Sequence, residues 1–381
     1  MPQPPILLVL ETGLMADSID YDYDYEQKEV DRGKDAPISA PIPSRPILMM
    51  IRTLILLTLS LVLGCRGDRD DALPSADRFD GSDPQAIAVQ LQLNWFPDVQ
   101  HGGYYAALVH GFYEQQGLQV TIRPGGPGVP VVTQVASGRV PFGVAGAENV
   151  LLGWPQQAQT IGLMAPLQHS PRCIMVHEQS GIRSFDQLEN VTLAISSSSL
   201  FSLFIQKRVP LAGVRVVPYS GNVAPFLLDQ HYAQQAFVFS EPLVARAQGS
   251  RPHVLMVSDL GYNPYTSVLI TRPKMIEDHP ELVSRMVRAS IQGWTQYLAD
   301  PDPTNRYLAE WNRDMDAEIL RSGVAALQDL CRMDQPTAQP FGQMTLDRWQ
   351  TLHDQLVEVQ ALQPGAVDPN DVFTIDFLPS E

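Results

Sequence analysis

Asn94, Trp95 and His101 are the residues whose types and spacing best suit the binding of a small molecule. Asn94 and Trp95 follow a predicted strand over 88–93, and His101 stands before two glycines at a predicted helix start. In α/β sheets, backbone N–H groups and side chains converge where strands end and helices begin. An indole there can stack on a flat ring, while amide and imidazole groups hydrogen-bond its edge. The stretch predicts one wall of a ligand site, and the alternative is that Trp95 and His101 are structural.

Further polar side chains stand near other predicted strand ends and helix starts. They are Tyr104, Glu148, Asn149, Ser196, Ser197, Tyr219, Asn222 and Glu241. A carboxylate such as Glu241 can accept two hydrogen bonds from an amino-substituted ring, and serines at a helix start suit phosphate, sulfonate or carbonyl oxygen. We take all of them as candidate ligand contacts. For each one the alternative is a helix cap or a core position.

The sequence carries no motif for a metal or a nucleotide. Its eight histidines and three cysteines never reach zinc-binding spacing. The glycines at 125–128 lack the Lys-Ser/Thr pair of a phosphate-binding loop, and no Gly-x-Ser-x-Gly elbow occurs. The net charge of -16 argues against a nucleic-acid partner. We therefore expect no metal, no cofactor and no nucleic acid.

One apolar segment, 54–63, follows Arg52 and is too short to span a bilayer. Residues 49–64 resemble a lipoprotein signal peptide, so cleavage before Cys65 would leave a lipid-bearing cysteine on an exported protein facing the periplasm or cell exterior. The alternative is an uncleaved anchor or a buried strand. Residues 1–48 are expected to be untranslated or disordered, and 65–85 to form a tether. We expect Cys173 and Cys331 to be buried free thiols rather than a disulfide.

The remaining sequence alternates between short β-branched runs and helical stretches, which indicates an α/β protein with largely parallel sheets. Strands are expected at 88–93, 118–122, 142–145, 161–165, 173–176, 191–195, 214–217, 236–239, 254–257 and 267–270. Only helices are expected after Arg272. The three- and four-residue spacing of apolar side chains predicts one over 280–298, another begins near Pro301, and others are expected near 317–330 and 345–360.

Several short motifs resemble one known family over about residues 88–330. They include Leu93-Asn94-Trp95-x-Pro97, Gly111-Phe112-Tyr113, Ser137-Gly138-Arg139-Val140, Asp186-Gln187-Leu188 and Ser240-Glu241-Pro242. This family joins fungal thiamine-pyrimidine synthases to bacterial periplasmic proteins that bind pyrimidine precursors, and more distant relatives bind nitrate, taurine and alkanesulfonates. The resemblance implies a type II periplasmic-binding-protein fold, in which two α/β lobes enclose a cleft and a helical region ends the chain.

That fold implies a first lobe of 86–178 plus 268–381 and a second lobe of 179–267. It also implies an ABC transporter permease as partner. The fungal relatives use a lysine that holds pyridoxal phosphate and a histidine consumed as substrate, yet this sequence has Ala145 and Asn149 at those places. Without an amine no Schiff base forms, so the resemblance favours binding without catalysis.

These observations predict a monomeric, lipid-anchored solute-binding protein of an ABC importer. Its expected ligand is a thiamine pyrimidine precursor, of the hydroxymethylpyrimidine or formylaminopyrimidine type, or a similar small heteroaromatic. One alternative is the same fold with a small anion, such as an alkanesulfonate, taurine or nitrate. Others are a pyrimidine synthase-like enzyme and a sensory or scaffold protein that has lost transport.

Overall fold

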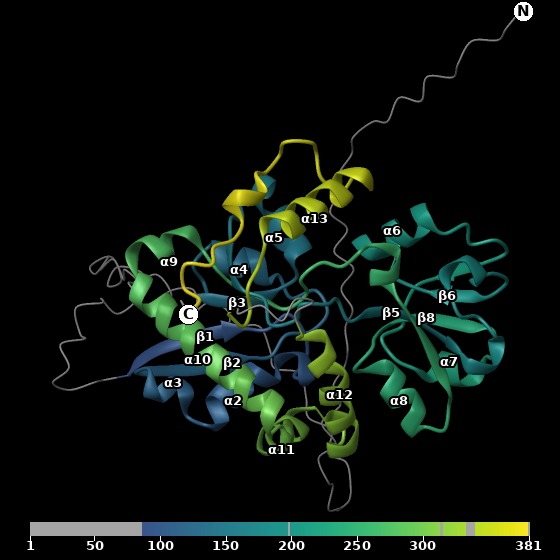
Figure 1. Cartoon of the computed structure of the whole chain (residues 1–381), viewed down its shortest axis with the longest axis horizontal. Coiled ribbons are helices and arrows are strands. Elements are labelled where there is room, and N and C mark those ends of the chain that lie inside the picture. The colour runs from purple at the N-terminus through teal and green to yellow at the C-terminus, as the bar shows by residue number, and fades with distance from the viewer. Residues whose placement is uncertain (1–85, 197–198, 313–314, 333–339, 380–381) are drawn as a thin grey trace, which may run out of the picture. The chain divides into compact units, whose positions relative to one another are not determined.

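The computed structural model describes residues 86–196, 199–312, 315–332 and 340–379 (Figure 1). The expected signal peptide, the lipidation site Cys65, the tether and Ser197 lie outside these residues. Within the described part of the chain, no helix combines the length and apolar character needed to cross a bilayer. The described residues build two five-stranded sheets with helices around them.

The first sheet has the strand order β2-β1-β3-β10-β4. Its strands are β1 (Ile87–Gln92), β2 (Leu118–Arg123), β3 (Phe142–Ala145), β4 (Ile161–Met164) and β10 (Val268–Thr271). Every residue of β3, β4 and β10 is buried, as expected for strands covered on both faces. β1 runs parallel to β2 and β3, whereas β10 is antiparallel to β3 and β4.

The second sheet has the strand order β7-β6-β8-β5-β9. Its strands are β5 (Arg172–His177), β6 (Thr192–Ala194), β7 (Arg215–Val217), β8 (Tyr232–Phe237) and β9 (Pro252–Met256). β6 is parallel to β7 and β8, but β5 is antiparallel to β8 and β9. The expectation of largely parallel sheets is therefore wrong, because β5 and β10, which follow the two passages between sheets, run against their neighbours.

All ten strands predicted from the sequence are present, and β8 begins four residues earlier than expected. The predicted lobe boundary at residue 178 counts β5 with the first lobe, yet β5 pairs only with strands of the second sheet among the described residues. The remaining limits of the two lobes stay a prediction. The fold class, two α/β units followed by a helical region, agrees with the observed elements.

The long helices near the C-terminus fall close to the ranges expected from the sequence. They are α10 (Pro280–Ala299), α11 (Asp302–Trp311), α12 (Ala317–Leu330) and α13 (Leu346–Glu358). The other helices are α2 (Gly102–Val109), α3 (Phe112–Gln115), α4 (Val131–Ala136), α5 (Ala147–Gly153), α6 (Leu200–Arg208), α7 (Ala224–Leu228), α8 (Glu241–Ala247) and α9 (Pro273–Asp278), with 3-10 turns η2 (Val99–His101), η3 (Trp154–Gln156), η4 (Glu178–Ser180), η5 (Phe185–Gln187), η6 (Val257–Leu260) and η7 (Pro369–Asp371).

Helices α2 and α10 pack against each other at glycines (Figure 1). A Cβ atom at Gly103 would lie 2.1 Å from Cγ of Trp294, and one at Gly293 would lie 2.2 Å from the backbone oxygen of Gly103. Tyr104, on α2, is fully buried, and its ring meets that of Trp294 edge to face at 5.7 Å between centroids. The structure thus buries Tyr104 in the core, and a ligand contact for it stays a prediction.

Both cysteines of the described residues are free and buried, in agreement with the expectation from the sequence. Burial raises the pKa of the Cys331 thiol to about 12, and burial also raises the pKa of Cys173 well above its usual value. Neither thiol is a reactive thiolate at neutral pH. Among the described residues, no cluster of three or more His, Cys, Asp or Glu side chains has the geometry of a metal site.

Candidate functional site

The loop that follows β1 holds itself together through buried polar side chains. His101 Nε2 lies 2.9 Å from Asn94 Oδ1, and His101 Nδ1 lies 3.4 Å from Asp98 Oδ1. The same Asp98 oxygen accepts the backbone N–H of Gln100 at 3.0 Å and so caps the turn η2. His101 is fully buried, so its contact with Asn94 fixes the loop rather than facing solvent. This corresponds to the structural alternative for His101.

Trp95 is presented by that loop and remains 40% exposed. Its only ring neighbour among the described residues is Phe96, at 5.5 Å between centroids in an edge-to-face arrangement. The backbone of Trp95 is held in place by Gly125, because the Trp95 carbonyl oxygen accepts the N–H of Gly125 at 3.0 Å. The loop backbone is therefore held in place at Trp95, while the indole itself stays exposed.

Glu148 and Asn149 open helix α5 directly after β3, and their side chains differ in surroundings. Asn149 is exposed, and its backbone N–H bonds to Gly146 at the helix start. The Glu148 side chain is only 7% exposed and forms an ion pair through Oε1 with Nη2 of Arg172, the first residue of β5. This pair joins α5, the helix after β3 of the first sheet, to β5 of the second sheet.

Arg172 is surrounded by aromatic rings. Its guanidinium carbon lies 5.8 Å from the ring centroid of Phe201, on α6, and 5.8 Å from that of Phe237, at the end of β8. Burial raises the pKa of Tyr262, Glu148 raises it further and Arg172 lowers it, so the phenol lies within the field of both charges. We call Glu148, Arg172, Phe201, Phe237 and Tyr262 the Glu148–Arg172 cluster.

Three buried polar atoms of this cluster lack a hydrogen-bond partner within the described part of the chain. They are Oε2 of Glu148, Nη1 of Arg172 and the hydroxyl oxygen of Tyr262. Buried polar groups in folded proteins are almost always paired, and leaving one unpaired costs about 1–3 kcal/mol. Of the three residues, Arg172 lies next to the rings of Phe201 and Phe237, so we take the cluster as a candidate ligand contact.

The serine run leads into the helix that carries Phe201. The backbone N–H of Ser196 donates to Oε1 of Gln235 at 2.7 Å, and the hydroxyl of Ser199 donates to the Ser196 carbonyl at 2.9 Å. Helix α6 then begins at Leu200. The main role of Ser196 in these contacts is to position the start of α6 beside Arg172.

Tyr219, in the segment after β7, and Glu241, at the start of α8, are in direct contact. The Tyr219 hydroxyl donates to Oε1 of Glu241 at 2.9 Å, and the backbone N–H of Phe237 donates to Oε2 at 2.8 Å. Glu241 is half-buried at the first position of α8. Burial raises its pKa, and the hydrogen bonds from Phe237 and Tyr219 act in the opposite direction. Each carboxylate oxygen is therefore already engaged, with one further lone pair left for another donor.

Asn222 is exposed and caps the start of α7, since its Oδ1 accepts the backbone N–H of Ala224 at 3.0 Å. The structure thus brings the predicted residues together in pairs: Asn94 with His101, and Tyr219 with Glu241. Phe237 connects Glu241 to the Glu148–Arg172 cluster through its backbone and its ring. Within the described residues, no hydrogen bond or ring contact joins Trp95 to Glu241.

Glu241→Gln is expected to stabilise the folded protein at neutral pH. Because burial raises the carboxyl pKa in the folded state, the folded protein binds this proton more tightly than the unfolded chain, so the Glu241 contribution to stability falls as pH rises above the usual carboxyl pKa. The amide has no charge to desolvate, and it can accept from Phe237 while donating to the Tyr219 oxygen. Urea unfolding at about pH 4 and about pH 7 measures this. A stability difference between variant and parent that does not grow from the lower to the higher pH would contradict it.

Sequence reasoning missed Arg172, Phe201, Phe237 and Tyr262. One signal for Arg172 was present, because it is a single charge at the start of a strand whose other residues are all buried. A buried arginine requires a partner. The sequence alone does not say that this partner is Glu148, 24 residues earlier and next to the other sheet.

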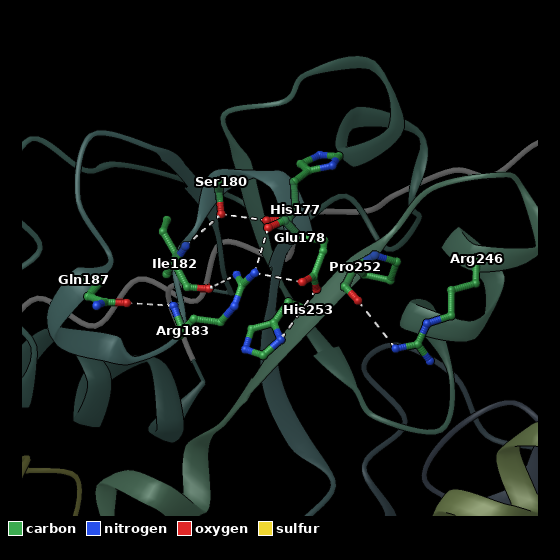
Figure 2. A network of polar contacts seen from close by, with 9 residues as sticks. All are labelled: His177, Glu178, Ser180, Ile182, Arg183, Gln187, Arg246, Pro252 and His253. Carbon is green, nitrogen blue, oxygen red and sulfur yellow. Dashed lines mark hydrogen bonds and ion pairs between the residues drawn. The ribbon is translucent and has the colours of Figure 1, made fainter.

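A second polar network lies at the opposite end of β5 (Figure 2). The Ser180 hydroxyl donates to the His177 carbonyl at 2.6 Å, and Nη2 of Arg183 donates to Oε1 of Glu178 at 2.8 Å. Two open cavities of about 290 and 530 Å³ lie beside these turns, and no predicted site residue lines them. The side chains of the network bond mainly to neighbouring turns, and no exposed aromatic ring lines the cavities within the described part of the chain. We therefore assign this region a structural role.

Comparison with known proteins identifies relatives over most of the chain. The riboflavin-binding protein RibY of Chloroflexus aurantiacus is 22% identical over 87% of this chain and 98% of its own. The formylaminopyrimidine-binding protein of Halalkalibacterium halodurans is 21% identical over 73% of this chain and 87% of its own. Both names are those of binding proteins.

Among solved structures, the periplasmic aliphatic sulphonate-binding protein SsuA of Escherichia coli aligns with a TM-score of 0.59 at 16% identity, over 77% of this chain and 94% of that one. This similarity establishes the periplasmic-binding-protein fold. The sequence profile described as NMT1/THI5 like matches residues 98–304, more than half of the 381 residues. With this fold and this match, the chain belongs to the NMT1/THI5-like family.

Proposed function

We propose that the protein is the solute-binding component of an ABC importer and captures a small, flat heteroaromatic compound. The observation that carries the proposal is the Glu148–Arg172 cluster, which holds buried polar atoms without partners among the described residues and in which the guanidinium of Arg172 lies beside the rings of Phe201 and Phe237. Aromatic rings bind the faces of a flat ligand, and a few polar groups fix its orientation. The cluster offers both.

The relatives support this ligand class. One is named for binding riboflavin and the other for binding formylaminopyrimidine, and both compounds are nitrogen heterocycles with flat rings. We therefore extend the proposed ligands from thiamine pyrimidine precursors, such as hydroxymethylpyrimidine and formylaminopyrimidine, to flavins. Binding without catalysis accords with Ala145 at the place of the lysine of the fungal synthases.

The cellular setting is part of the same proposal. Cleavage before Cys65 would attach the protein to a membrane through lipid, and the tether would let the folded part reach an ABC transporter permease. We propose that it acts as a monomer outside the cytoplasm, with lobes of 86–178 plus 268–381 and 179–267, adjusted so that β5 belongs to the second lobe.

A small anion is the second candidate ligand. The serine run and the guanidinium of Arg172 favour it, and the fold is shared with a sulphonate-binding protein. However, Glu148 already neutralises Arg172, and the half-buried carboxylate of Glu241 repels an anion. These charges favour the uncharged ring.

Titration calorimetry of the purified protein tests the proposal. The compounds are riboflavin, formylaminopyrimidine, hydroxymethylpyrimidine, taurine, an alkanesulfonate and nitrate. Native mass spectrometry of the protein as purified adds an unbiased readout of any molecule it carries. We expect a flavin or a pyrimidine to bind and the anions not to bind. Binding of an anion in the absence of binding by any ring compound would refute the ligand class.

Trp95→Ala is expected to weaken binding of the ring compound about tenfold without destabilising the fold, since loss of an aromatic stacking contact costs about 0.5–1.5 kcal/mol beyond its buried area. The indole is 40% exposed, so its removal leaves the core intact. The matched control is Trp311→Ala on α11, where the indole is 56% exposed. Calorimetry and thermal unfolding of both variants decide the matter. Equal affinities in the two variants would exclude Trp95 from the site.

A further inference from the structure

We infer that Glu148 and Arg172 together recognise one edge of an uncharged ring on which a hydrogen-bond donor stands beside an acceptor. A lactam, an imide and an aminopyrimidine all carry such an edge. The inference rests on the proposed function and narrows its ligand class. It concerns the atoms of this ion pair, which the sequence does not single out.

The ion pair is made by one contact only. Nη2 of Arg172 donates to Oε1 of Glu148, whereas an arginine and a carboxylate can form two parallel hydrogen bonds. The second donor, Nη1, and the second acceptor, Oε2, stay without partners among the residues that the structure describes. The pair therefore presents one free donor and one free acceptor from adjoining groups.

Burial makes these two free atoms significant. The side chains of Glu148 and Arg172 are 7% and 14% exposed, so water has little access to them. A ligand whose N–H donates to Oε2 and whose ring nitrogen or carbonyl accepts from Nη1 satisfies both atoms at once. The affinity for such a ligand then depends on the hydrogen-bonding groups at the edge of its ring as well as on the burial of its apolar faces.

The charges of the pair select against ions. The arginine and the glutamate neutralise each other, so the pair as a whole attracts neither sign of charge. The free oxygen of Glu148 repels an anion, and the guanidinium of Arg172 repels a cation. Tyr262 is 1% exposed, and its hydroxyl is unpaired among the described residues. The rings of Phe201 and Phe237 border the same guanidinium and suit a flat ligand.

Methylation of the ligand edge tests the inference on the unmodified protein. Calorimetry compares riboflavin with 3-methylriboflavin, and formylaminopyrimidine with its N,N-dimethylamino analogue. Each methylated compound keeps the flat ring and loses the donor. For whichever parent ring binds, we expect methylation to weaken binding at least about tenfold, as loss of a hydrogen bond to a charged group does.

Glu148→Gln provides the second test. The amide oxygen can replace Oε1 as acceptor for Arg172, but the remaining free group becomes an NH₂ donor, and the site gains a net positive charge. We expect binding of the parent ring to weaken at least about tenfold and binding of 1-butanesulfonate, absent in the unmodified protein, to become measurable. Glu358→Gln is the control. It makes the same change in a pair with Arg208 that lies at the surface, and it should alter neither affinity.

The outcomes separate this inference from the proposed function. If the unmodified protein binds the methylated ring as tightly as its parent, or prefers 1-butanesulfonate to both rings, the recognition by Glu148 and Arg172 is wrong while solute binding stands. If it binds none of these compounds, the proposed function fails and the inference fails with it. Should Glu148→Gln not fold, the comparison of methylated and parent rings still decides the point.

Discussion

Arg172→Met is expected to destabilise the folded protein by about 3–5 kcal/mol, the usual cost of removing one partner from a buried ion pair. Methionine fills much of the same space but leaves the carboxylate of Glu148, 7% exposed, without its counter-ion. The variant also loses the donor that we assign to the ligand, so binding of the ring compound should become undetectable by calorimetry. Urea unfolding measures the stability change.

Two further variants show whether burial is the cause. Combining Arg172→Met with Glu148→Gln removes both charges, and we expect it to recover part of the lost stability without restoring binding. Arg208→Met breaks the pair with Glu358, in which the arginine side chain is 49% exposed and the glutamate side chain 30% exposed. Because this pair is largely solvated, the change should lower the free energy of unfolding by less than about 1 kcal/mol. Equal effects of Arg172→Met and Arg208→Met would show that Glu148 does not depend on its buried partner.

The positions of strands and helices follow closely from the sequence because burial leaves a clear pattern in it. α10 occupies Pro280–Ala299, within one residue of the range 280–298 that its apolar spacing predicts. β8 is the exception, since it begins at Tyr232 rather than near Ala236. Gln234 is fully buried, and Gln235 uses its side chain to hold the loop at Ser196, so both break the apolar pattern that marks a strand.

Strand direction was predicted less well. A four-residue apolar run such as β10 reads the same whether it runs parallel or antiparallel to its neighbours. The direction depends on how the chain enters the sheet, and β5 and β10 both enter from the other sheet. The resemblance to a two-lobed fold implied the two passages, but the alternation of strands and helices favoured parallel pairing.

The candidate site was predicted only in part. Placing polar residues at strand ends and helix starts singles out Glu148 and Glu241, but it does not say which atoms are already paired within the protein. His101 was included because it precedes two glycines at a helix start, and Tyr104 because it lies on the same helix, and the structure buries both side chains. Arg172 was missed because its partner lies far away in the sequence.

The close contact between helices α2 and α10 depends on Gly293. A Cβ atom there would lie 2.2 Å from the backbone oxygen of Gly103 and 2.6 Å from the backbone nitrogen of Ala107. Backbone atoms cannot rotate aside as a flexible side chain can, so any relief requires α2 and α10 to separate. Separation would loosen Tyr104 and Trp294, which are fully buried between these elements.

Gly293→Ala is therefore expected to lower the free energy of unfolding by about 3 kcal/mol or more, the upper end of what overpacking costs. This loss exceeds the gain of about 1 kcal/mol that alanine brings to a helix interior relative to glycine. Gly126→Ala is the control, because a Cβ atom there would only touch the ring of Phe96 at 3.4 Å. Urea unfolding of the two variants gives the comparison. If both unfold at the same urea concentration as the parent, α2 and α10 do not meet backbone to backbone at Gly293.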